Sequence, residues 1–187
     1  SGPVKEAFQK AFYRPEQKLF ADSEVSAHCS LHANLYAACF GLMPKEAEDA
    51  YEALMLTPGR RCGIFPMYFA LRGLARMGRY ETLYRLLTRE DDGGWRNMLR
   101  EGATTCFEAW GKDQKWNTSL CHPWGSGAIP LVIEELAGIH PDPNEASGYR
   151  FCPCLPEQIA DFRLQVPLRE QLLQVVRERG AAATIIV

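Results

Sequence analysis

The stretch PMYFALRGLARMGRYETLYRLL, residues 66–87, decides the fold, because it contains two predicted helices and the turn between them. Apolar residues recur at helical spacing from Pro66 to Met77 and again from Tyr80 to Leu87, and Gly78 separates the two segments. A connection this short requires the two helices to pack antiparallel. The stretch therefore predicts a helical hairpin.

The same pattern extends through the first two-thirds of the chain. Apolar side chains recur at helical spacing, and turns that contain glycine or proline separate the segments. The other predicted helices are residues 4–12, 24–42 with Ser23 as N-cap, 45–56, 95–100 and 128–137. The chain is therefore predicted to be mainly α, a stack of helical hairpins.

The pattern changes after Pro141. Residues 149–154 alternate between apolar and polar, and residues 161–166 and 183–187 are rich in strand formers. Residues 168–177 fit either a helix or a strand. The tail is thus predicted to begin a β-rich module. Its last apolar strand needs a partner upstream or beyond the chain, and a fragment of a larger protein is expected.

Composition excludes some classes of function. The 187 residues are 47% hydrophobic and 24% charged, with a formal net charge of −2. A general nucleic-acid binder needs a basic face to neutralise phosphates, so no nucleic-acid partner is expected. Charges interrupt the apolar stretches well before the roughly 20 residues of a membrane span, so no membrane partner is expected either. The sequence leaves the cellular compartment open.

Residues that could bind a ligand or take part in catalysis concentrate between Trp95 and Trp124. All four tryptophans of the chain lie there, at positions 95, 110, 116 and 124, together with Glu108 and His122. Aromatic rings cover the apolar C–H faces of sugars, while carboxylates and imidazoles bind their hydroxyl groups. The cluster therefore favours a carbohydrate ligand, and the alternative is that the tryptophans fill gaps between helices.

Glu108 is the sharpest candidate for a catalytic group. It lies between Phe107 and Trp110, and its neighbour Ala109 offers no counter-charge. Apolar surroundings disfavour an ionised carboxylate, so the pKa of Glu108 is expected to rise into the range that suits acid–base catalysis. An exposed loop glutamate is the alternative, which spacing alone does not exclude.

Other groups of residues are weaker candidates for a functional site. His28 and His32 lie four apart on a predicted helix, where pocket-lining or core histidines are favoured over a metal site. The seven cysteines, including those of Cys152-Pro153-Cys154, are expected to be mostly reduced, buried thiols. Cys121 precedes a histidine, but adjacent side chains usually point apart. We expect no metal ion and no cofactor.

Two segments of the chain resemble bacterial α-L-rhamnosidases. EGATTCFEAW, residues 101–110, resembles the GATT-x-x-E-x-W stretch of that family. SLCHPWG, residues 119–125, resembles its serine–histidine–tryptophan segment. Shorter likenesses at residues 33–44, 136–139 and 148–153 extend the resemblance over most of residues 3–166.

The resemblance implies a fold and a division of the chain. Residues 1–143 would form the later part of an (α/α)6 barrel, in which an inner ring of helices surrounds the site. Residues 144–187 would begin a C-terminal β-sandwich. The remainder of the parent enzyme would complete the barrel, and the face exposed without it would favour self-association.

The resemblance also implies a reaction, the inverting hydrolysis of a terminal α-L-rhamnose from a glycan or glycoside. Glu108 would be the general base that activates water, and the general acid would lie outside this chain. His122 would bind sugar hydroxyls, and Trp95, Trp110 and Trp124 would wall the pocket.

The sequence departs from the family pattern near the expected base. Ala109 and Gly111 stand where relatives often carry charged residues, which leaves the preferred sugar open. Two alternatives therefore remain. One is a six-hairpin-barrel glycosidase or lyase that acts on a different sugar, and the other is a non-catalytic, carbohydrate-binding helical scaffold.

Overall fold

The computed structural model describes residues 2–58, 62–168 and 171–186. The chain forms two compact units, Ser1–Gly127 and Ala128–Val187. No helix within the described ranges has the length and apolarity that crossing a lipid bilayer requires. The domain boundary predicted after residue 143 concerns the parent fold and stays a prediction.

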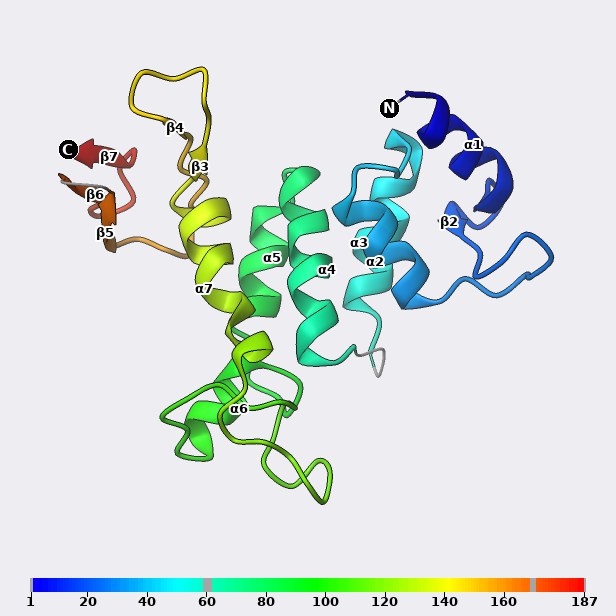
Figure 1. The fold of residues 1–187 in the computed structure, drawn as a ribbon, viewed down its shortest axis with the longest axis horizontal. Helices are drawn as coiled ribbons and strands as arrows, with labels where there is room; N and C mark the ends of the chain where they lie inside the picture. The colour runs from blue at the N-terminus through cyan, green and yellow to red at the C-terminus, as the bar shows by residue number, and fades with distance from the viewer. Residues whose placement is uncertain (1, 59–61, 169–170, 187) are drawn as a thin grey trace. The chain divides into compact units, whose positions relative to one another are not determined.

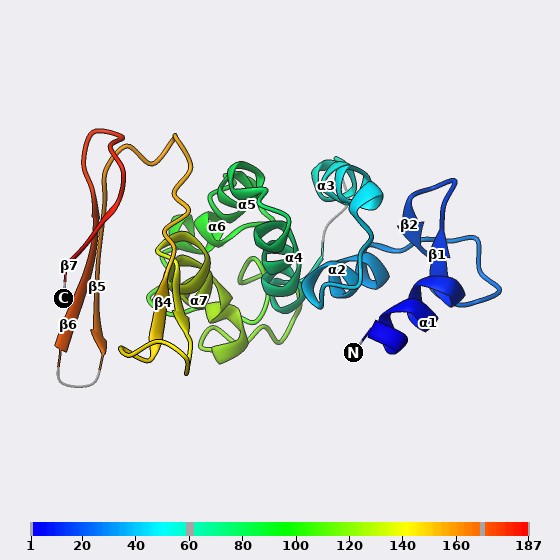
Figure 2. The ribbon, with the colours of Figure 1, turned by 90° about the horizontal axis from the view of Figure 1, so that it is seen from above.

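Helices are the main regular elements of the first unit, and long loops connect some of them (Figure 1). Its larger helices lie in two layers, α2 and α4 in one and α3 and α5 in the other, as Figure 2 shows from above. Its elements are α1 (Gly2–Phe12), β1 (Tyr13–Arg14), β2 (Leu19–Phe20), α2 (Leu31–Cys39), η1 (Lys45–Ala47), α3 (Glu48–Leu56), α4 (Ile64–Arg76), α5 (Tyr80–Leu87), α6 (Trp95–Arg100) and η2 (Pro123–Gly127).

The predicted hairpin is α4 and α5. Buried side chains of α4 recur three or four residues apart, at Ile64, Met67, Leu71 and Leu74, so one face of the helix enters the core. Gly78 ends the helix with a φ of +72°, a conformation that favours glycine. The predicted helices at 4–12, 45–56, 80–87 and 95–100 are likewise confirmed.

Helices α2 and α4 pack at unusually close range. A Cβ atom on Gly73 would lie 2.7 Å from the Cβ of Ala38 and 3.1 Å from the hydroxyl of Tyr51. The Tyr51 side chain is fully buried, and its hydroxyl donates a hydrogen bond of 2.9 Å to the carbonyl oxygen of Ala70. Only a residue without a side chain fits at position 73, so this glycine sets the distance between the two helices.

The predicted start of the helix at 24–42 is wrong. Helix α2 begins at Leu31, and its N-cap is Ser30, whose side chain accepts the backbone N–H of Ala33 at 3.1 Å. The preceding loop is held by tertiary hydrogen bonds. Asp22 accepts the backbone N–H of Ser30 at 2.9 Å, and the Arg14 guanidinium donates to carbonyl oxygens of the loop. These bonds satisfy backbone groups that a longer helix would otherwise use.

The second unit begins with a helix and continues as two small antiparallel sheets. The predicted helix at 128–137 is present, although the backbone bond from Ala137 N–H to the Val132 oxygen, 2.8 Å long, has π-helical spacing. The elements are α7 (Ala128–Pro130), the π-helical η3 (Leu131–Leu136), β3 (Ile139–Pro141), β4 (Tyr149–Phe151), β5 (Phe162–Leu168), β6 (Gln171–Arg177) and β7 (Thr184–Ile186).

The structure resolves the ambiguity for residues 171–177, which form strand β6, whereas residues 169 and 170 lie outside the described residues. Strand β6 pairs with β5 on one side and with β7 on the other, so the last apolar strand has its partner upstream. The unit has a small buried core, formed by Ala137, Ile139, Leu173 and Val175. Strand β3, which pairs with β4, was not predicted from the sequence.

All seven cysteines are free, as predicted, but the prediction that most of them are buried is wrong. Three of them, Cys29, Cys39 and Cys62, are buried, whereas Cys121 is exposed and the other three are half-buried. Burial raises the pKa of the Cys62 thiol to about 11, which keeps this thiol protonated and unreactive at neutral pH.

Adding a methyl group at Gly73 is expected to destabilise the first unit. Alanine favours a helix interior by about 1 kcal/mol over glycine, but overpacking costs about 1–3 kcal/mol. We therefore expect Gly73→Ala to lower the free energy of unfolding measured by urea titration. The double variant Gly73→Ala/Ala38→Gly restores the space and should recover part of the loss. If the changes in the free energy of unfolding of the two single variants add up to that of the double variant, the contact is contradicted.

Candidate active site

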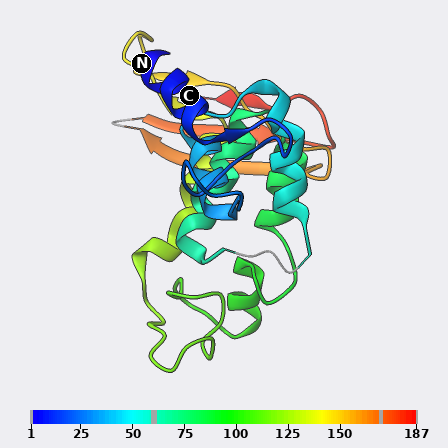
Figure 3. The same cartoon turned by 90° about the vertical axis from the view of Figure 1, so that its right-hand side faces the viewer.

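The loop that follows α6 carries the predicted site residues, and Figure 3 shows it extending from one end of the helical layers. Gly102, with a φ of +80°, turns the chain out of the helix. The Glu101 carboxylate accepts the Asn97 side chain at 2.7 Å and the backbone N–H of Lys112 at 2.8 Å. Asn97, which is buried, also donates to the carbonyl oxygen of Trp110 at 3.0 Å. Helix α6 thus anchors the loop at two points.

The two segments that carry Glu108 and His122 lie side by side. The backbone N–H of Glu108 donates to the oxygen of Ser119 at 2.8 Å, and that of His122 donates to the oxygen of Cys106 at 2.8 Å. These bonds hold two irregular segments in a fixed register. They bring the predicted base and the predicted sugar-binding histidine into the same small region.

The Glu108 carboxylate is held by two donors. One oxygen accepts a hydrogen bond from the Lys115 ammonium, and the other accepts the backbone N–H of Ser119 at 3.1 Å. The side chain is 16% exposed. These two donors lower the pKa of Glu108 below its ordinary value, Lys115 contributing most and Ser119 next, and the charge of His122 adds to the effect.

The predicted rise in the pKa of Glu108 is therefore wrong. The sequence neighbour Ala109 offers no charge, but the loop folds back and places Lys115 against the carboxylate. Donors to the ionised form outweigh the partial burial that would favour the neutral form. Glu108 is thus an ionised carboxylate throughout the neutral and mildly acidic range.

Trp124 connects the aromatic part of the site to Glu108. Its indole N–H donates to the backbone oxygen of Glu108 at 3.2 Å. Its ring centroid lies 4.2 Å from that of His122, with the two planes inclined by 44°. The Trp124 side chain remains 45% exposed. An open aromatic ring and an imidazole therefore adjoin an ionised carboxylate.

Trp95 and Trp110 pack against each other and bind the backbone of neighbouring segments. Their rings meet edge to face, with centroids 5.0 Å apart. The Trp95 N–H donates to the oxygen of Gly125 at 2.7 Å, and the Trp110 N–H donates to the oxygen of Cys62 at 2.8 Å. Because Trp110 is only 5% exposed, its contacts here are those of a packing residue. Its role as a pocket wall stays a prediction, as does that of Trp95.

Gly125 permits the closest approach within the loop. A Cβ atom at this position would lie 2.4 Å from the backbone oxygen of Phe107 and 2.9 Å from the Cβ of Cys106. No larger residue fits without displacing the segment that carries Glu108. The glycine in the tryptophan–glycine pair is therefore a packing requirement.

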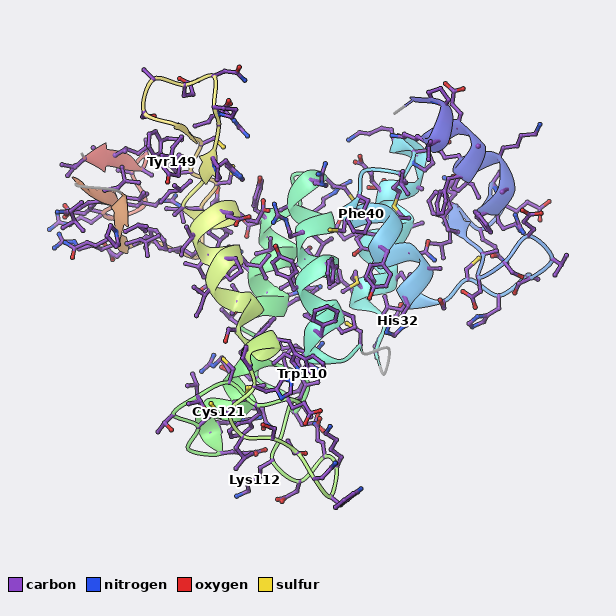
Figure 4. The ribbon with its side chains drawn as sticks, viewed as in Figure 1. His32, Phe40, Trp110, Lys112, Cys121 and Tyr149 are labelled. Carbon is purple, nitrogen blue, oxygen red and sulfur yellow. The ribbon has the colours of Figure 1, made fainter. Side chains whose placement is uncertain are left out.

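A cavity of about 530 Å³ opens beside the same loop. Figure 4 labels Lys112 and Cys121 in this region. Its lining mixes hydroxyl-bearing, charged and apolar residues, with Thr104, Thr105 and Ser119 among those that contribute hydroxyl groups. Ser119 connects the cavity to Glu108, because its backbone N–H binds the carboxylate.

Other candidate residues named in the sequence take no part in the contacts around Glu108. Trp116 is 96% exposed. His28 precedes α2 and binds Asp22 at 2.6 Å, and its bond helps to lower the pKa of Asp22 to about 2. His28 and His32 therefore do not share a helix face. Across the residues that the structure describes, no group of three or more potential ligand side chains is placed to hold a metal ion.

Comparisons with known proteins identify the family to which the chain belongs. The model of the bacterial alpha-L-rhamnosidase six-hairpin glycosidase domain matches residues 1–135. The chain belongs to the bacterial α-L-rhamnosidase six-hairpin glycosidase family. The helical hairpins are therefore part of the family's six-hairpin domain, and a small β-rich part follows them.

A solved structure shares the fold of this family member. The α-L-rhamnosidase from Dictyoglumus thermophilum matches with a TM-score of 0.66 and 17% identity. The match covers 94% of this chain and 20% of that one, so the chain spans about a fifth of the length of that rhamnosidase. No curated protein matches the chain.

The sequence did not predict the two groups that bind the Glu108 carboxylate. Lys115 and the backbone N–H of Ser119 control the charge of Glu108. Lys115 lies in an irregular loop, where no helical or strand spacing predicts which side chains meet. The predicted roles of Glu108, His122 and the tryptophans stay predictions, while their proximity is a property of the structure.

The titration of Glu108 provides a direct check of the carboxylate environment. We expect its side-chain carboxyl carbon, followed by NMR, to titrate below the ordinary pKa of glutamate. Lys115→Met removes the largest cause, so the midpoint should move upward. Lys112→Met is the matched control, because that exposed lysine contacts Glu101 through its backbone only. Equal midpoints in the two variants would contradict the assignment.

Proposed function

We propose that this chain is part of a glycoside hydrolase that removes terminal α-L-rhamnose with inversion at the anomeric carbon. In this proposal Glu108 is the general base that takes a proton from the attacking water. Family membership supports the class of enzyme. The observation that carries the residue assignment is the ionised carboxylate of Glu108 beside His122 and Trp124.

A general base has to be ionised before it can accept a proton. The lowered pKa of Glu108 keeps it in that form at neutral and mildly acidic pH. The two donors to the carboxylate also fix its orientation. Since a carboxylate offers about four lone-pair directions, two remain for a water molecule. The geometry thus supports the role of a base better than that of an acid.

Sugar recognition is assigned to the rings beside Glu108. The exposed Trp124 ring offers a plane for the apolar C–H face of a sugar. His122 offers a ring nitrogen to sugar hydroxyls. A water-mediated or direct contact to hydroxyl groups in the cavity at Ser119 would extend the polar side of the site.

Inversion requires a second carboxyl group roughly 6.5–9.5 Å from the base, so that water fits between base and sugar. We place this general acid in the part of the parent enzyme outside residues 1–187. The solved rhamnosidase is about five times the length that the chain covers, which supports this placement. The activity is therefore a property proposed for the parent enzyme.

The test is release of 4-nitrophenol from 4-nitrophenyl α-L-rhamnoside by the full-length parent enzyme and by residues 1–187. Only the parent is expected to turn over. Glu108→Gln in the parent should lower kcat/KM by about 10²–10⁴-fold, because the base is lost while the shape of the side chain is kept. Glu145→Gln, at an exposed turn between β3 and β4, is the control and should leave the rate unchanged.

The stereochemistry of the product provides a second readout. Inversion at the anomeric carbon of an α-rhamnoside yields the β-anomer first, which ¹H NMR detects before mutarotation. Initial release of the α-anomer would refute the role of Glu108 as a base for water. An inert parent enzyme would show that rhamnose is the wrong sugar and favour another glycosidase or lyase of the same fold.

A further inference from the structure

Phe65 is an exposed aromatic residue that neither the sequence analysis nor the proposed site includes. It lies in the first turn of α4, and 45% of its side chain is exposed. Its ring centroid is 5.9 Å from that of Trp124, with the planes inclined by 44°. On its other side it meets Phe69 edge to face at 5.3 Å. Phe65 therefore extends the aromatic surface that begins at Trp124.

The rings form a continuous series that starts at the proposed base. Trp124 binds the Glu108 backbone through its indole N–H, and its ring centroid lies 4.2 Å from that of His122 and 5.9 Å from that of Phe65. Polar groups thus lie at one end of the series and an apolar ring lies at the other. A ligand that spans it needs hydroxyl groups at the first end and an apolar surface at the second.

The surroundings hold Phe65 in place. The residue before Gly63, Cys62, accepts the Trp110 N–H through its backbone oxygen at 2.8 Å, which fixes the entry into α4. The isoleucine that precedes Phe65 is 2% exposed and anchors the same turn in the core. A ring that is fixed before binding loses little conformational freedom on binding.

Core packing does not account for the position of Phe65. The core-facing residues of α4 are Ile64, Met67, Leu71 and Leu74, and each of them is at most 3% exposed. Phe65 lies off this face. Phe40 provides a comparison, because it too is exposed and adjoins Phe69, at 6.3 Å. Phe40 follows the end of α2, whereas Figure 4 places Trp110 at the opposite end of the helices, toward the loop.

Resting on the proposed function, we propose that Phe65 is a sugar-binding residue that selects a 6-deoxyhexose. Its ring contacts the apolar edge of the bound sugar, which in rhamnose consists of ring C–H groups and the C6 methyl group. His122 and Glu108 face the hydroxyl-bearing part. A hydroxymethyl group at C6 would place a hydroxyl against an apolar ring, where it loses its hydrogen bonds to water.

The kinetic test uses the full-length parent enzyme with 4-nitrophenyl α-L-rhamnoside and 4-nitrophenyl α-L-mannoside, which differ by the C6 hydroxyl. Phe65→Ala should raise KM for the rhamnoside about three- to tenfold and leave kcat within about twofold, because stacking stabilises ground state and transition state alike. The ratio of kcat/KM for the rhamnoside to kcat/KM for the mannoside should fall. Phe65→Tyr, which keeps the ring plane, should stay near the wild type in KM.

Phe40→Ala is the matched control, since it removes an exposed ring that also adjoins Phe69 but lies away from Trp124. It should leave KM and the sugar preference unchanged. Phe65→Leu keeps an apolar side chain, guards against loss of folding, and should give an intermediate KM. If Phe65→Ala behaves as Phe40→Ala does, while Glu108→Gln is inactive, the inference on Phe65 is overturned and the proposed function stands.

A binding measurement covers the case in which the parent does not hydrolyse the rhamnoside, so that the proposed function fails. Saturation-transfer NMR then reports which protons of free L-rhamnose contact the protein. Strong transfer to the C6 methyl group that Phe65→Ala abolishes and Phe40→Ala does not would support the contact. Absent transfer, or transfer unchanged in Phe65→Ala, would overturn it.

Discussion

The contact between α2 and α4 at Gly73 is the constraint on which the rest of the first unit depends. With no side chain at Gly73, the helix backbone comes within reach of Ala38, and the buried Tyr51 hydroxyl closes the gap from α3. Both helices run in the same direction, and their beginnings lie toward the loop that follows α6 (Figure 1). One small residue thus sets the spacing of the framework that positions Phe65 and its neighbours.

The loop itself has no regular secondary structure, yet its hydrogen bonds determine its shape. Asn97 and Glu101 hold one end, the paired backbone of Glu108 and Ser119 holds the middle, and Gly125 closes against Phe107. Each of these bonds satisfies a backbone group that a loop would otherwise leave to water. The geometry proposed for catalysis can rest on such a loop because these hydrogen bonds fix its shape.

Local periodicity predicted most of the helices, because their core faces repeat every three or four residues, as in α4. It failed where distant residues decide the outcome. Helix α2 begins late because Arg14 and Asp22 bind the backbone of the preceding loop. The carboxylate of Glu108 is more acidic than expected because Lys115 returns to it through an irregular loop. Neither contact has a periodic signature in the sequence, whereas the motif around Glu108 identified the family without either.

The Lys115 contact has opposing effects on the chemistry proposed for Glu108. It keeps the carboxylate ionised, which a base requires, and it occupies one oxygen and weakens the carboxylate as a proton acceptor. Because the ammonium stays adjacent, it also stabilises the returning negative charge once the proton leaves Glu108. The pair therefore suits a carboxylate that accepts a proton from water and then releases it to solvent, whereas an acid would need the neutral form that Lys115 disfavours.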